Sequence, residues 1–88
     1  MRITLKLFAM LSDHLPHEAN GQKRLGNELA VDIPDGTSVQ GVVERYNLPP
    51  QLVHVVLVNG VYIAPQARTA HMLKADDELA IWPPIAGG

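Results

Sequence analysis

Only one segment of this chain has the hydrophobic spacing of a full amphipathic helix, and it stands between segments that are spaced as β-strands. Over residues 39–46 the apolar side chains stand at i, i+3, i+4 and i+7, which places Val39, Val42, Val43 and Tyr46 on one helical face. A chain of 88 residues forms one small domain. The apolar face of a single helix has to be covered, and the strand-like segments can cover it. The pattern therefore predicts a helix packed on a sheet, which is an α+β fold.

Capping residues predict the ends of this helix. Ser38 or Thr37 can serve as the N-cap, because a hydroxyl oxygen accepts a hydrogen bond from the free N–H groups of a first turn. Asn47 tolerates the left-handed conformation that often follows a last turn. Gly41, inside the helix, costs about 1 kcal/mol relative to alanine. A close approach of the helix to the sheet would explain that glycine.

Period-two alternation and apolar runs predict the strands. Near the start of the chain, apolar residues alternate with polar ones, which is typical of a half-buried strand. Asn59-Gly60 supplies the positive φ angles of a type I′ turn, so the chain is expected to fold back there as a hairpin. The predicted strands cover Ile3 to Leu7, Leu29 to Ile33, His54 to Val58, Val61 to Ile63 and a last segment with Leu79 and Ile81.

Two shorter segments complete the predicted order. Met10 to Leu15 is predicted as a short helix that ends at Pro16, and the polar stretch His17 to Arg24, which contains Asn20-Gly21, as a loop. The order is strand, short helix, strand, helix and three strands, with the first and last strands as the central pair. The expected fold is a ubiquitin-like β-grasp, in which a mixed sheet of about five strands packs on one main helix.

Composition and charge exclude several function classes. The net charge of −2 and the pI near 6.0 give no electrostatic footprint for nucleic acid. Apolar runs such as Val55 to Val58 are far too short to span a membrane. The strand-like start of the chain has no apolar signal segment, so secretion is not expected and a cytoplasmic location fits.

The residues that most often carry chemistry are absent or scattered. The chain has no cysteine, which excludes disulfides, thiolate metal sites and a nucleophilic or persulfide-forming thiol of its own. His14 and His17 have a spacing that suits a metal, but Pro16 interrupts the helix between them, and a solvated surface position is the simpler interpretation. The acidic residues 76–78 are interpreted as a turn, not as a catalytic carboxylate pair. No metal site is predicted.

The sequence ends in a segment that favours insertion into another protein over a frayed tail. A domain at residues 1–82 is followed by an arm at 83–88, whose two prolines stiffen its root. Glycine has no Cβ, so the last two peptide units can pass through a channel too narrow for other residues. In this prediction the carboxylate of Gly88 is the reactive group, and the threading residues are Pro83, Pro84, Ile85, Ala86 and Gly87.

Four stretches of the chain carry a resemblance to a known family. They are Ile3-Thr4-Leu5-Lys6-Leu7-Phe8-Ala9, Gly36-Thr37-Ser38-Val39, Val56-Leu57-Val58-Asn59-Gly60 and, the most specific, Asp77-Glu78-Leu79-Ala80-Ile81-Trp82-Pro83-Pro84-Ile85-Ala86-Gly87-Gly88. With them the chain resembles the MoaD/ThiS family of sulfur-carrier proteins over nearly its whole length. The resemblance implies a carrier without catalytic activity of its own, such as the small subunit of molybdopterin synthase.

The same resemblance implies a mechanism and a set of partners. An E1-like enzyme uses ATP to adenylate Gly88, a persulfide donor supplies sulfur, and the resulting thiocarboxylate delivers it to the large subunit of molybdopterin synthase or another acceptor. The chain itself is expected to bind no cofactor. Phe8 and Trp82 are out of phase with the core residues of their strands, which makes them candidates for docking a partner. Packing over the second face of the sheet, or over a loop, is the alternative.

Two departures from the family leave the pathway open. The segment Leu48 to Leu52 is shorter than is usual for molybdopterin-synthase small subunits, and the loop from Pro16 to Asn27 is longer. The expected pathway for such a carrier is the biosynthesis of the molybdenum cofactor, with thiamine biosynthesis or another thiolation pathway as the alternative. A different class of function is a ubiquitin-like modifier that joins Gly88 to lysines of target proteins. A third is an interaction-only β-grasp module with an inert tail.

Overall fold

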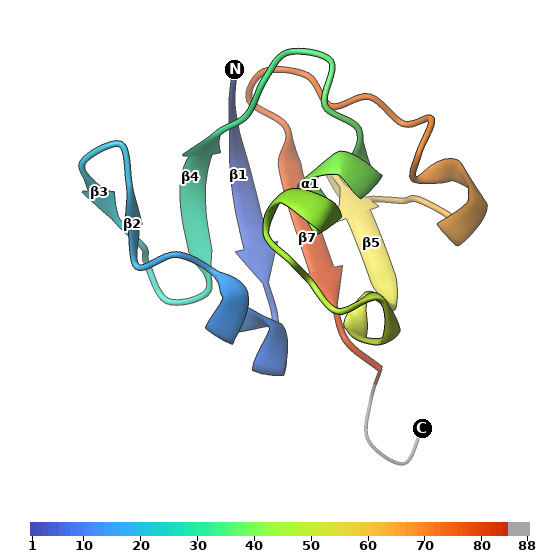
Figure 1. The fold of residues 1–88 in the computed structure, drawn as a ribbon, viewed down its shortest axis with the longest axis horizontal. Coiled ribbons are helices and arrows are strands. Elements are labelled where there is room, and N and C mark those ends of the chain that lie inside the picture. The colour runs from blue at the N-terminus through green and yellow to red at the C-terminus, as the bar shows by residue number, and fades with distance from the viewer. Residues whose placement is uncertain (85–88) are drawn as a thin grey trace.

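The computed structural model describes residues 1–84, which fold around one five-stranded mixed sheet (Figure 1). The strands β1 and β7 lie at its centre and run parallel, whereas every other neighbouring pair is antiparallel. In spatial order the strands are β4 (Glu28–Asp32), β1 (Arg2–Leu7), β7 (Glu78–Trp82), β5 (Val55–Val58) and β6 (Val61–Tyr62). The prediction that the first and last strands form the central pair is confirmed.

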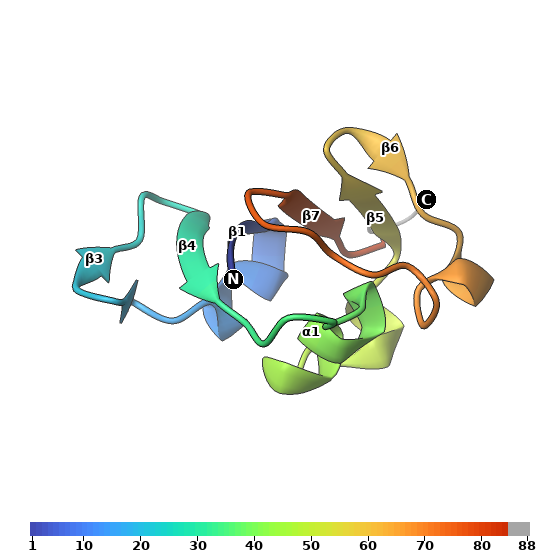
Figure 2. The same ribbon diagram turned by 90° about the horizontal axis from the view of Figure 1, so that it is seen from above.

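The helix α1 (Val39–Arg45) crosses one face of this sheet and closes the core (Figure 2). Its three core valines, at 39, 42 and 43, are buried, as the period predicted. The strands turn alternate residues toward the helix, and these are also buried: Ile3, Leu5, Leu7, Leu29, Val31, Val56, Val58, Leu79 and Ile81. Helix and sheet together form the ubiquitin-like β-grasp that the sequence predicted.

The first turn of α1 is capped by its own N-cap residue and by a distant loop. Ser38 is the N-cap, and its hydroxyl oxygen accepts a hydrogen bond from the N–H of Gly41 at 3.0 Å. The N–H groups of the first two helical residues donate to the carbonyls of His71 and Arg68, both at 3.0 Å. These bonds satisfy donors that a helix N-terminus leaves free, so the loop before β7 fixes where the helix begins.

The structure gives a different explanation for the glycine at position 41 from the one that the sequence suggested. A Cβ at this position would lie 3.0 Å from Cγ2 of Thr37 and 3.4 Å from the hydroxyl oxygen of Ser38. The close neighbour is therefore the segment that enters the helix, and the expectation of a close approach to the sheet is wrong. At the other end Asn47 has a φ of 54°, the left-handed conformation predicted for it.

Two turns of the same kind connect short antiparallel strands. Asn59 and Gly60, with φ of 51° and 81°, join β5 to β6 as predicted. Asn20 and Gly21, with φ of 53° and 77°, join β2 (Glu18–Ala19) to β3 (Gln22–Lys23). The stretch predicted as a loop is therefore a small hairpin, and that prediction is wrong.

The remaining connections contain three short 3₁₀ helices. They are η1 (Ala9–His14), η2 (Pro50–Leu52) and η3 (Pro65–Ala67). The short helix predicted over residues 10–15 is thus a 3₁₀ helix that begins one residue earlier. Three residues predicted as strand residues, Ile33, His54 and Ile63, lie just outside the strands. Their N–H groups still donate to carbonyls in the sheet or next to it, those of Met1, Trp82 and Val56.

Candidate functional site: the arm root and the open face of the sheet

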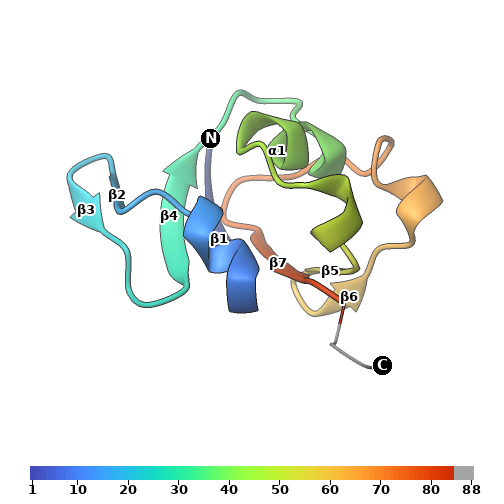
Figure 3. The ribbon, with the colours of Figure 1, turned by 60° about the horizontal axis from the view of Figure 1, so that its bottom comes forward.

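The last strand leads directly into the predicted arm, beside the start of β5 (Figure 3). The carbonyl of Trp82 accepts a hydrogen bond from the N–H of His54 at 3.0 Å. Pro83 is buried and Pro84 is exposed, so the first of the six predicted arm residues packs on the domain. The predicted roles of Ile85, Ala86, Gly87 and Gly88 fall on residues outside those that the structure describes.

The face of the sheet opposite α1, which we call the open face, has an apolar half over β7, β5 and β6. The register places Ala80 between Lys6 and Leu57, and pairs Leu57 in turn with Tyr62. The apolar patch of this face consists of Phe8, Val55, Leu57, Tyr62 and Trp82, which are half-buried or exposed, with the buried Ala80 between them. The sequence analysis singled out only Phe8 and Trp82; the same period-two alternation that predicted the buried residues of β5 could have placed Val55 and Leu57 on this face as well.

The two predicted docking residues are brought together by the parallel register of the central strands. Leu7 pairs with Ile81, so Phe8 and Trp82 follow side by side, and the N–H of Phe8 donates to the carbonyl of Ile81 at 3.1 Å. Their rings are stacked, with centroids 4.1 Å apart and an angle of 9° between the planes. Both side chains are half-buried, so the pair still presents surface immediately beside the arm root. Stacking of this kind contributes about 0.5–1.5 kcal/mol beyond the buried area.

The other half of the open face is charged. Lys6 lies 3.3 Å from a carboxylate oxygen of Glu78, and the Nε of Arg2 donates to Asp32 at 3.0 Å. The hydrogen bond from Arg2 holds the pKa of the Asp32 carboxyl below its usual range. A partner that covers the open face therefore meets an apolar surface next to the arm root and paired charges farther away. The change from apolar to charged surface along the sheet limits the orientations in which a partner can bind the open face.

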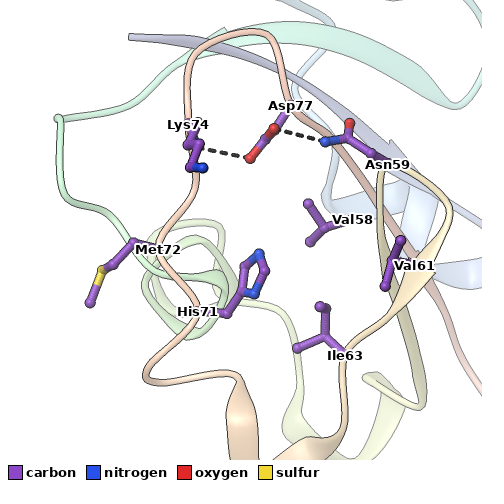
Figure 4. A pocket seen from close by; sticks show the side chains of 8 residues that line it. All are labelled: Val58, Asn59, Val61, Ile63, His71, Met72, Lys74 and Asp77. Atoms are coloured by element: carbon purple, nitrogen blue, oxygen red, sulfur yellow. Dashed lines mark hydrogen bonds between the residues drawn. The ribbon is translucent and has the colours of Figure 1, made fainter.

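A small pocket lies at the opposite end of β5 from the arm root (Figure 4). Its volume is about 300 Å³, and its floor is formed by the buried side chains of Val58 and Ile63. The one carboxylate in its lining, Asp77, is already occupied: its two oxygens accept from the Nδ2 of Asn59 and the backbone N–H of Lys74, both at 2.8 Å. The pocket therefore has a structural network in its wall, and this network joins the hairpin turn to the start of β7.

This network predicts a large loss of stability when Asp77 is removed. The side chain is 9% exposed, and hydrogen bonds to a charged group contribute about 1.5–3 kcal/mol each. Asp77→Ala is expected to lower the free energy of unfolding in urea by about 2–3 kcal/mol. Asp76→Asn is the matched control, because residue 76 is exposed and asparagine tolerates its φ of 70°. Equal stability of the two variants would contradict the role given to the network.

The other sequence candidates do not come together. His14 ends η1, and His17 lies exposed in the segment that follows. Within residues 1–84, no three His, Asp or Glu side chains gather as a group that could hold a metal ion. In the same part of the chain, no helix combines the length and the apolar content needed to cross a membrane.

Solved structures with the same fold match this chain over all or nearly all of its length. The Haloferax volcanii protein HVO 2177 matches with a TM-score of 0.73 and 25% identity, over 100% of this chain and 87% of its own. SAMP1 from the same organism matches with a TM-score of 0.63 and 24% identity, over 100% of both chains. A Pyrococcus furiosus protein assigned as molybdopterin converting factor, subunit 1, matches with a TM-score of 0.62 and 19% identity, over 97% of this chain and 99% of its own.

Sequence comparison adds the family. No curated protein matches the chain. The profile of one family does match, over residues 18–88, which include α1, the β5–β6 hairpin, β7 and the whole arm. Because this match covers well over half of the sequence and agrees with the β-grasp fold, the chain belongs to the ThiS family.

Proposed function

We propose that this protein is a sulfur carrier whose carboxylate at Gly88 is adenylated by an E1-like enzyme and then converted to a thiocarboxylate. Membership of the ThiS family carries the proposal, because the matched segment runs to residue 88 and includes Gly87-Gly88. The position of the arm root supports it. The chain leaves the sheet next to the apolar patch, so one partner can bind the patch and receive the arm together.

In this proposal the catalysis is performed by the partners. A carboxylate is a poor acyl donor, because its leaving group would be oxide. ATP, used by the activating enzyme, converts Gly88 to an acyl-adenylate and releases pyrophosphate. The terminal sulfur of a partner's persulfide attacks the carbonyl carbon and expels AMP, which gives an acyl disulfide. A second partner thiol then attacks the partner's cysteine sulfur in that acyl disulfide, so the S–S bond breaks, a disulfide forms between the two partner thiols, and the thiocarboxylate is released. The chain has no cysteine and contributes neither thiol.

The domain's own task is to dock and to aim the arm. Phe8 and Trp82 form the part of the apolar patch nearest the root, and we assign them to partner docking. Pro83 is held on the domain, so the chain that threads into the partner starts at Pro84. Ile85 and Ala86 then pack against the walls of the partner's channel, and Gly87 and Gly88 enter its narrowest part.

The favoured acceptor is the large subunit of molybdopterin synthase. The segment Asp77 to Gly88 resembles the ending of the carriers that serve this enzyme, and the Pyrococcus furiosus protein with the same fold is assigned as molybdopterin converting factor, subunit 1. Thiamine biosynthesis or another thiolation pathway is the alternative for a carrier of this family. Activation at Gly88 is common to all of them.

A ubiquitin-like modifier is the second candidate. Its supporting observation is the fold shared with SAMP1, the small archaeal modifier protein 1 of Haloferax volcanii. Here the same acyl-adenylate would end in an isopeptide bond to a lysine of a target protein. The two functions differ in what is attached to Gly88.

The intact mass of the protein, purified from its own cells, tests both candidates. A sulfur carrier is expected to show a fraction that is heavier by the difference between one sulfur and one oxygen atom, located at Gly88. A modifier is expected to give peptides in which Gly88 is joined to a lysine. If Gly88 carries neither change, even when the sulfur pathway is active, the proposal is wrong. The measurement also identifies the last residue of the mature chain.

A further inference from the structure

Within residues 1–84, Arg68 is buried and no carboxylate pairs with it. It follows η3 in the connection between β6 and β7 and is only 7% exposed. Its Nη1 and Nη2 donate to the carbonyls of Val53 and His54 at 3.2 and 2.9 Å. Its Nε is buried and has no acceptor among residues 1–84, and none of the ion pairs in that part of the chain includes it.

Stability alone gives little reason for an arginine at this position. A buried guanidinium loses its hydration, and two neutral carbonyls replace that hydration only in part. The orphaned Nε adds a further cost. An apolar side chain of similar volume would fill the same space without a buried charge. What an apolar side chain would not do is hold two consecutive carbonyls in one fixed orientation, as the guanidinium fork does.

The segment held by Arg68 is the one that anchors the arm root. The N–H of His54 donates to the carbonyl of Trp82 at 3.0 Å, and Val55 pairs with Trp82 in the sheet. Pro83 follows and has no N–H to donate, so the bond from His54 is the last that the sheet makes to β7 before the arm. The carbonyl of Val53 and the N–H of His54 belong to one peptide group, so Arg68 binds one side of the peptide whose other side bonds to Trp82 at the arm root.

We infer that Arg68 is a positioning residue for the arm. Its guanidinium orients the backbone of residues 53–54, and through the His54–Trp82 hydrogen bond it sets the direction in which the chain leaves β7. The inference rests on the proposed function, because it concerns how Gly88 is presented to the activating enzyme. It assigns to Arg68 no contact with the partner, with ATP or with Gly88.

The kinetic test is adenylation of Arg68→Met by the activating enzyme of the same organism, followed as release of pyrophosphate. The apolar patch is unchanged, so KM is expected to stay within about twofold, whereas kcat is expected to fall about tenfold because fewer docked complexes have the arm inserted. Arg68→Lys, with one compact ammonium in place of the fork, is expected to recover only part of kcat.

Arg24→Met is the matched control. Arg24 also donates to two backbone carbonyls, those of Ser12 and Leu15, each at 2.9 Å, and so holds η1 without any contact to residues 53–54. If loss of stability were the cause, kcat would fall in both variants in proportion to the decrease of each variant's urea midpoint from that of the wild type. Equal kcat for Arg68→Met and wild type, or an equal loss in both arginine variants, would overturn the inference.

Amide hydrogen exchange gives a readout that does not depend on the enzyme. In Arg68→Met the N–H of His54 is expected to exchange at least about tenfold faster, while the N–H groups of the central strand β1 keep their protection. Unchanged exchange at His54 overturns the positioning role even if the protein is a sulfur carrier. Wild-type protein that is not adenylated by the activating enzyme of the same organism, together with fast exchange in the variant, would instead contradict the proposed function and leave the role at the root supported.

Discussion

Deleting Gly88 is expected to reduce adenylation at least about 100-fold, because the carboxylate of Gly87 would then end about 3.3 Å short of the reacting phosphorus and a misplacement of 1 Å already costs about 100-fold. One residue added after Gly88 is expected to have the same effect, since the carboxylate then lies beyond the reaction site. Pyrophosphate release measures both variants with the activating enzyme of the same organism.

Neither change at Gly88 is expected to affect the domain. The core lies between α1 and the sheet and is complete by β7, so the thermal midpoint of both variants should match that of the wild type. Gly88→Ala separates chain length from width: the chain keeps its length and gains only a Cβ, so a loss of adenylation in this variant measures how narrow the channel is. Adenylation of the deleted or extended chain at the wild-type rate would show that the position of Gly88 does not determine the reaction, and it would contradict the proposed function.

The core could be predicted from the sequence because each of its elements shows its period locally. The alternation over residues 2–7 and the helical spacing over residues 39–46 each identify a buried face without any knowledge of the partner element. The β2–β3 hairpin shows no such period, since each of its strands has two residues. Its signal was the dipeptide Asn20-Gly21, which is the same as at the predicted hairpin turn, Asn59-Gly60.

The apolar patch and the arm root could be predicted only in part, because they depend on how β1 and β7 are aligned in the sheet. The phase of Phe8 and Trp82 marked both as residues of the open face, but their stacking follows from the pairing of Leu7 with Ile81. Arg68 gave no signal at all. Its side chain bonds to residues 14 and 15 positions earlier, and no local pattern predicts a contact of that kind.

Trp82→Ala is expected to raise KM for adenylation about 30- to 100-fold, which corresponds to about 2–3 kcal/mol and is typical of an aromatic residue at the centre of an interface. The kcat of the docked complex should change much less, because the arm and its anchor at His54 remain. Leu25→Ala is the control: Leu25 is 77% exposed and lies outside the open face, so its KM should equal that of the wild type. Equal KM for both variants would contradict docking through the apolar patch.

The variant Phe8→Ala tests whether the rise in KM of Trp82→Ala comes from the stacked pair of rings or from the indole ring alone. With centroids 4.1 Å apart, each ring holds the other in place, so Phe8→Ala also leaves the indole of Trp82 without its support. The losses in the two single variants are therefore expected to exceed, when added, the loss in the double variant by about 0.5–1.5 kcal/mol. Additive losses would mean that the two rings bind the partner independently, and that their stacking serves only the fold.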